Sequence, residues 1–128
     1  MTHQPPEFTE ALAAVLRDLR VQGPVQPDVR EEDDYPGVML FAPDGSGHGV
    51  YAEPDGRPAV LLAEVAGQVQ GWAVEALWAA GVSAVWPQCP EHPDTHPLRA
   101  TVEKGAAVWV CPRSGAVACR VGELGLGG

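Results

Sequence analysis

Basic residues are scarce in this chain of 128 residues, which has eight Lys and Arg against 17 Asp and Glu and a formal net charge of −9. The cations are scattered, so the sequence offers no basic patch of the kind that nucleic-acid-binding proteins use. Binding to an anionic membrane surface is disfavoured for the same reason, and no apolar run is long enough to span a bilayer. We therefore expect neither nucleic acid nor membrane as a partner.

Cysteines are also few, and the N-terminus does not look like a secretory signal. The first residues, from Met1 to Pro6, lack the basic start and the apolar segment of a signal peptide. The sequence therefore favours a cytoplasmic protein, in which thiols stay reduced. Three cysteines cannot all pair with one another, so a disulfide framework is disfavoured. Metal ligation or burial is the better interpretation of the cysteines.

Apolar periodicity predicts a first helix close to the N-terminus. Pro5 and Pro6 favour a helix start, and Gly23 followed by Pro24 favours its end. The apolar residues that recur at helical spacing are Phe8, Leu12, Val15, Leu16 and Leu19. We expect this apolar face to pack on the rest of the same domain.

A second, longer helix is predicted from about residue 58 to residue 80, with Gly81 as its C-cap. One polar stripe runs along it and consists of Glu64, Gln68, Gly71 and Glu75. Nearly every other position is apolar, so the helix should be buried over most of its circumference, between the first helix and the strands. We expect both Trp72 and Trp78 to lie in the core.

Short β-strands are predicted on both sides of the second helix. Residues 38–42 and 50–52 should pair as a hairpin through a glycine-rich loop, with His48 exposed at its tip. Residues 24–36 should form an acidic loop bounded by prolines. Further strands are predicted at residues 82–86, 98–102, 106–111 and 116–121.

These elements predict an α+β fold, in which two helices pack on short antiparallel strands and the C-terminal part is a β-meander. We expect one domain over residues 1–128. Within it, residues 1–86 should hold the main core, residues 87–122 should form a metal-binding meander, and residues 123–128 should be a flexible tail.

The stretch from Cys89 to Cys111 carries the strongest chemical signal. Cys89 and His92 are separated by two residues, a spacing that lets both side chains point at one centre across a tight turn. Cys111 is followed by proline, as Cys89 is, and opens a second turn in which Gly115 is best able to take a positive φ. Thiolate and imidazole are ligands that zinc favours. The sequence therefore predicts a zinc site.

These two turns resemble the knuckles of a zinc ribbon. In that family each knuckle reads Cys-Pro-x-Cys-Gly, lies on short antiparallel strands and often has an aromatic residue two positions before a cysteine. Residues 89–92, Cys-Pro-Glu-His, resemble the first knuckle with His92 as its second ligand. Residues 109–115, Trp-Val-Cys-Pro-Arg-Ser-Gly, resemble the second knuckle. The resemblance is confined to the C-terminal part of the chain and implies zinc held between the two turns.

The chain departs from the zinc-ribbon pattern at Pro93, which replaces a glycine, and at Ser114, which replaces a cysteine. Serine is a poor zinc ligand, so the fourth ligand must come from elsewhere or the position stays open. His96, in the same proline-rich loop, is one candidate. Cys119 is the other, although it alternates with apolar residues and should face the core. The predicted metal ligands are Cys89, His92, His96 and Cys111, with Cys119 as the alternative fourth ligand.

The sequence contains no recognisable catalytic constellation, so we assign no catalytic residue. We expect a small zinc-binding domain that is not an enzyme and that interacts with a protein partner or has a regulatory role. The main alternative is a zinc-dependent hydrolase with an open metal position, in which Glu91 or Asp94 would be the base. A third possibility is a metal-free adaptor or immunity-like protein.

Overall fold

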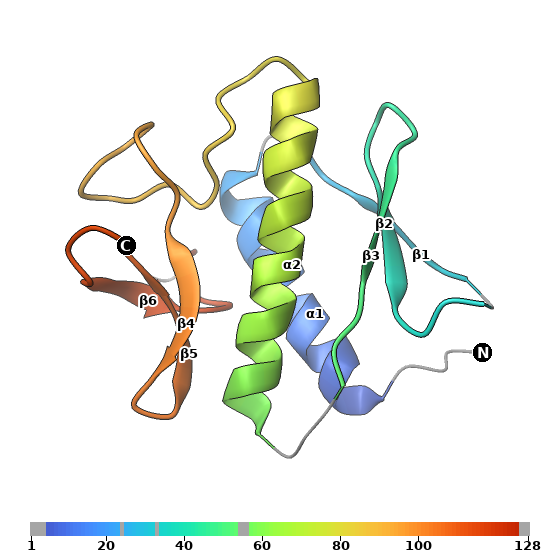
Figure 1. Ribbon diagram of the computed structural model, residues 1–128, viewed down its shortest axis with the longest axis horizontal. Coiled ribbons are helices and arrows are strands. Elements are labelled where there is room, and N and C mark those ends of the chain that lie inside the picture. The colour runs from blue at the N-terminus through green and yellow to red at the C-terminus, as the bar shows by residue number, and fades with distance from the viewer. Residues whose placement is uncertain (1–4, 24, 33, 54–56, 126–128) are drawn as a thin grey trace.

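The computed structural model describes residues 5–23, 25–32, 34–53 and 57–125 (Figure 1). They form two helices and two three-stranded antiparallel sheets, which confirms the predicted α+β class and its C-terminal meander. In chain order the elements are α1 (Pro6–Gln22), β1 (Asp28–Glu31), β2 (Val38–Phe41), β3 (Gly47–Val50), α2 (Pro58–Ala79), β4 (Arg99–Glu103), β5 (Ala106–Val110) and β6 (Val117–Arg120). Across the described part of the chain, neither helix combines the length and the apolar character that crossing a membrane requires.

α1 begins and ends as its sequence predicts. Pro6 opens the helix, where its missing N–H would have had no partner in the first turn. The N–H of Gly23 closes the last turn by donating to the carbonyl of Leu19 at 2.6 Å, and the side-chain amide of Gln26 donates to the same carbonyl at 3.0 Å. The buried residues of α1 are Phe8, Ala11, Leu12, Val15, Asp18 and Leu19. The predicted apolar face is therefore the one that packs.

α2 ends in a Schellman turn at the predicted glycine. Gly81 has φ of +74°, which glycine adopts without a steric penalty. Its N–H donates to the carbonyl of Trp78 at 3.1 Å, and the N–H of Val82 donates to the carbonyl of Leu77 at 3.2 Å. These two bonds satisfy carbonyls that the end of a helix otherwise leaves unpaired.

α2 is the central packing element, as predicted. It lies between the two sheets and contacts α1, β3, β4 and β5 (Figure 1). Two glutamines on it hold neighbouring segments through their backbone. Gln68 bonds both the N–H and the carbonyl of Tyr51, at 2.9 and 2.7 Å. Gln70 donates to the carbonyls of Trp86 and Leu98, at 3.1 and 2.6 Å, and so ties together both ends of the loop between α2 and β4.

The two tryptophans of α2 differ in burial. Trp72 is 3% exposed and lies in the core as predicted, but Trp78 is 79% exposed, so the prediction for Trp78 is wrong. Trp78 follows Glu75 by three residues and therefore continues the polar stripe of the helix rather than its apolar face. The helical spacing decides the burial of this residue, and its apolar character does not.

The N-terminal sheet has the order β1-β2-β3. The prediction of a loop over residues 24–36 missed β1, in which all four residues are exposed. β1 has one apolar residue, Val29, so it carries no alternating apolar signal, and its pairing with β2 defines it as a strand.

The hairpin of β2 and β3 is confirmed in kind, but its second strand is Gly47–Val50 and not residues 50–52. The glycines serve close packing. A Cβ atom added at Gly47 would lie 2.7 Å from Cε1 of Phe41, and one at Gly49 would lie 2.5 Å from the hydroxyl of Tyr35. His48 is exposed as predicted, but it lies in β3 opposite Leu40 and not at the loop tip. Its Nδ1 is 3.7 Å from Oε2 of Glu75 on α2.

The C-terminal sheet has the order β4-β5-β6, and β5 is its buried central strand. A two-residue turn joins β4 to β5, with Lys104 and Gly105 both at positive φ (52° and 77°). This matches the type I′ turn that hairpins favour. The predicted strand at residues 82–86 is wrong, because this extended segment pairs with no strand in the described part of the chain. At its end, the carbonyl of Trp86 accepts a bond from Gln70 on α2 instead.

One buried carboxylate connects α1 to the C-terminal sheet. Asp18 is 0% exposed, and its oxygens accept bonds from Nε1 of Trp109 at 2.9 Å, from the N–H of Gly122 at 2.6 Å and from the N–H of Leu124 at 3.0 Å. Bonds to a charged acceptor are among the stronger ones in proteins. Leu124, in the segment predicted as a flexible tail, packs against the core, while residues 126–128 lie outside the described residues.

Candidate metal centre

The first ligand-bearing turn is held inside a closed loop between α2 and β4. A backbone bridge pairs Gln88 with Pro97, and the N–H of Leu98 donates to the carbonyl of Pro87 at 2.8 Å. These bonds hold the two ends of the loop side by side. Within the loop, the N–H of His92 donates to the carbonyl of Cys89 at 3.1 Å, which forms the predicted tight turn.

The second turn follows β5. Two backbone hydrogen bonds close this turn. The N–H of Cys111 donates to the carbonyl of Ala116 at 2.9 Å, and the N–H of Gly115 donates to the carbonyl of Cys111 at 2.8 Å. Gly115 has φ of +78°, the conformation predicted for it. The N–H of Ser114 points at the sulfur of Cys111, with N and Sγ 3.4 Å apart. This turn therefore presents a thiol that already receives a backbone hydrogen bond.

The two turns bring four side chains to one point, namely Cys89, His92, His96 and Cys111. Their ligand atoms all lie within 4.8 Å of one another. Nδ1 of His92 is 3.6 Å from each of the two sulfurs and 3.1 Å from Nε2 of His96. Nε2 of His96 is 4.0 Å from the sulfur of Cys111. These four residues are positioned to bind a metal ion.

The histidine rings are oriented for ligation through different nitrogens. Nδ1 of His96 lies 3.2 Å from the carbonyl oxygen of Pro97, a contact in which the ring must donate. Nε2 of His96 then carries the lone pair and faces the cluster, as is common for metal-binding histidines. His92 faces the cluster with Nδ1. In the metal-free protein the two nitrogens can share one proton at this distance, and a cation between them would bind both as ligands.

The cysteines are deep in the cluster and the histidines lie nearer the surface. Cys89 and Cys111 are buried, whereas both rings are partly exposed. Hydrogen bonding from Ser114, whose backbone nitrogen lies 3.4 Å from Sγ, lowers the pKa of the Cys111 thiol to about 6. Cys111 is therefore mostly thiolate at neutral pH, and the thiolate is the form that binds metals.

Ser114 connects the two turns even though it stands where a zinc ribbon has a ligand. Its hydroxyl donates to Oε1 of Glu91 at 2.8 Å and accepts from the N–H of Ala116 at 3.1 Å. The sequence drew attention to Glu91 only as a possible base. Its position directly before His92 in a ligand-bearing turn was the available hint of a supporting role.

Cys119 lies apart from the cluster. It is on β6, paired across the sheet with Trp109, and is half-buried. Burial, followed by the nearby charges of Asp18 and Glu123, raises the pKa of its thiol to about 11. Of the two candidates for the fourth position, the structure brings His96 to the other three side chains and leaves Cys119 outside.

Comparison with known proteins gives no relative on which to base a function. No protein-family model, no curated protein and no solved structure matches the chain. The structure has two Cys-Pro turns, the second of them at the end of a strand in an antiparallel meander. The chemistry of the cluster itself must support any functional assignment.

Proposed function

We propose that this protein is a small zinc-binding domain in which the ion is structural, and that the domain serves protein interaction and not catalysis. The observation that carries the proposal is the convergence of two thiols and two imidazoles from separate turns. Two sulfur and two nitrogen ligands form one of the common structural zinc sets.

Four of the distances in the cluster are close to those around a tetrahedral zinc ion. Bonds of about 2.3 Å to sulfur and 2.0–2.1 Å to nitrogen at tetrahedral angles place S and N about 3.6 Å apart and the two nitrogens about 3.3 Å apart. The corresponding separations here are 3.6, 3.6 and 4.0 Å for S to N, and 3.1 Å for N to N. Magnesium and calcium prefer oxygen ligands, which disfavours them here.

A structural role is favoured over a hydrolase because four protein ligands fill a tetrahedral site. A catalytic zinc usually keeps one position for water. The two residues that a hydrolase would use as base are engaged with the protein: Glu91 accepts from Ser114 at 2.8 Å, and Asp94 accepts from Nε2 of Gln88 at 3.0 Å. Both carboxylates therefore support the loop architecture around the ligands.

Metal analysis of the purified protein tests this proposal. We expect one zinc per chain in the wild type, and loss of bound zinc in Cys89→Ala, His96→Ala and Cys111→Ala. Cys119→Ala and His48→Ala are matched controls of the same residue types outside the cluster and should keep the full content. A wild-type content below about half an equivalent, in protein prepared with zinc and without chelator, overturns the proposal.

A further inference from the structure

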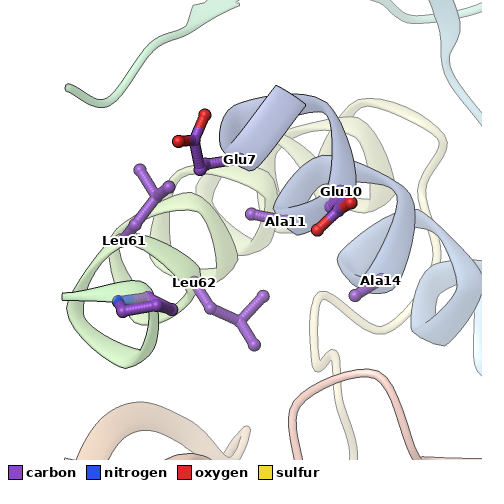
Figure 2. A pocket seen from close by; sticks show the side chains of 7 residues that line it. Glu7, Glu10, Ala11, Ala14, Leu61 and Leu62 are labelled. Carbon is purple, nitrogen blue, oxygen red and sulfur yellow. The ribbon is translucent and has the colours of Figure 1, made fainter. Parts of the chain in front are cut away.

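A groove separates the first turns of α1 and α2 on the surface, away from the metal centre. It has a volume of about 220 Å³. Figure 2 shows Ala11 and Ala14 on α1 across from Leu61 and Leu62 on α2. The two alanines leave room where larger side chains would close the gap between the helices. Because ligand pockets for whole small molecules usually exceed about 300 Å³, the groove suits one or two protruding apolar side chains.

The α1 side of this groove is acidic. Glu7 and Glu10 line it together with the alanines, and both are exposed. Positions 7, 10, 11 and 14 are three or four residues apart, so they share one helix face. Neither carboxylate forms an ion pair with another residue in the described part of the chain. The groove thus combines an apolar floor with two unpaired negative charges and has no Lys or Arg among its lining residues.

The charged side chains that line the groove are both negative. Each helix N-terminus carries roughly half a positive charge, and both helices begin close by at Pro6 and Pro58. Two full carboxylate charges exceed these two half charges. A second copy of this chain is a poor occupant, because a two-fold contact through the groove would bring four carboxylates together on a chain of net charge −9.

We infer that the groove between α1 and α2 is a docking site for an amphipathic helix of a partner protein that carries Lys or Arg beside its apolar face. Leucine-sized anchors fill the apolar floor, and the basic residues pair with Glu7 and Glu10. Helices that bind grooves in this way present anchors at positions i, i+3, i+4 and i+7. The inference rests on the proposed interaction function and names the surface that performs it.

A designed probe peptide tests the inference on the full chain. The probe is a synthetic helix with Leu on one face and Lys on the other, and its binding is measured by fluorescence anisotropy at about 0.15 M salt, where distant charges are screened. Backbone NMR shifts of the wild type locate the binding site. A second peptide, with Glu in place of every Lys, is the control for charge.

We expect the double variant Glu7→Lys/Glu10→Lys to bind the Lys peptide about tenfold more weakly than the wild type. Glu64→Lys, an exposed reversal on α2 outside the groove, should change binding by less than about twofold. Ala14→Phe should fill the groove and weaken binding by at least as much as the charge reversal. Ala13→Phe, at an exposed neighbouring position outside the groove, should not weaken it.

The inference is overturned if the Lys peptide does not bind, if the groove variants bind it as the wild type does, or if the Glu peptide binds equally well. Zinc content is measured on every variant, because this separates the two proposals. If the wild type contains full zinc but does not bind the Lys peptide, the docking site alone is overturned. If the protein takes up no zinc but binds the peptide through the groove, the docking site is supported and the metal proposal is contradicted.

Discussion

Removing zinc should lower the thermal stability of the wild-type protein, and the length of the loop that the ion closes gives the scale of the effect. The ion would link Cys89 to Cys111, which are 111 − 89 = 22 residues apart. Treated as a cross-link, a loop of this length restricts the unfolded chain by about 3 kcal/mol. With an unfolding entropy of about 2.1 cal/mol/K per residue, this corresponds to a fall of about 10 °C in the melting temperature.

The assay is thermal unfolding followed by circular dichroism, with zinc in slight excess or with a chelator. Stabilisation of about 3 kcal/mol requires free zinc at roughly a hundredfold or more above its dissociation constant, so the zinc concentration must be held fixed between samples. Cys111→Ser should melt at the same temperature with and without chelator. Cys119→Ser should keep the full chelator effect, because its side chain lies outside the cluster.

Two results would refute this reasoning. One is a chelator shift below about 2 °C in the wild type, which is too small for a link across the loop. The other is a chelator shift of full size in Cys111→Ser, which would mean that the ion binds without the second turn. Comparing wild type with wild type avoids the separate cost of altering a buried side chain, since both samples contain the same residues.

Three further predictions concern other parts of the molecule. Asp18→Ala removes the acceptor of three donors, two of them buried, and should destabilise the protein by about 3 kcal/mol or more in urea unfolding. A loss below about 1 kcal/mol would contradict the role of Asp18. Gly37→Ala would place a Cβ 1.9 Å from a backbone oxygen of β3 and should destabilise the protein by about 1–3 kcal/mol. Gly71 has open space around it, so Gly71→Ala should stabilise the protein by about 0.5–1 kcal/mol. Equal effects of the two substitutions in urea unfolding would refute this reasoning. The pKa of Cys111 in the metal-free protein is lowered to about 6, so the thiolate absorbance should rise near that pH, and this rise should be absent in Cys111→Ser. The pKa of Cys119 is raised to about 11, so its thiolate absorbance should appear only in strong alkali. Since protons compete with the metal for the Cys111 thiolate, zinc affinity should fall as the pH drops through about 6, and an affinity independent of pH between 5 and 7 would contradict this.

The helices and the ligand-bearing turns could be predicted because their signals are local. Helical spacing located α1 and α2, and glycine located the end of α2. The same spacing puts Trp78 on the polar stripe, and Trp78 is exposed despite its apolar side chain. A periodic pattern is a better guide to burial than the chemistry of one residue near a helix end.

The features that could not be predicted depend on contacts between distant segments. β1 has no apolar face and becomes a strand only by pairing with β2. Residues 82–86 are rich in β-branched and aromatic side chains, yet no strand pairs with them in the described part of the chain. The carbonyl of Trp86 accepts a hydrogen bond from Gln70 on α2 instead. Asp18 interrupts an apolar stripe, and that interruption was the available signal of a buried polar anchor.

The choice of a fourth ligand also depends on tertiary structure. By sequence, both His96 and Cys119 were candidates, and their chain distances from Cys111 do not discriminate between them. The bridge from Gln88 to Pro97 closes the loop and brings His96 inward, while the pairing of β5 with β6 keeps Cys119 beside Trp109. These two backbone pairings place His96, and not Cys119, beside the other three ligand side chains.

The most direct test of the central claim is zinc-edge X-ray absorption on the zinc-loaded protein. We predict two sulfur atoms at about 2.3 Å and two imidazole nitrogens at about 2.0–2.1 Å, with an unchanged spectrum for Cys119→Ser. His96→Ala should lose one nitrogen or fail to hold the ion. A first shell of oxygen and nitrogen without sulfur, or a spectrum that changes with Cys119→Ser and not with Cys111→Ser, would contradict the assignment of Cys89, His92, His96 and Cys111 as the metal centre.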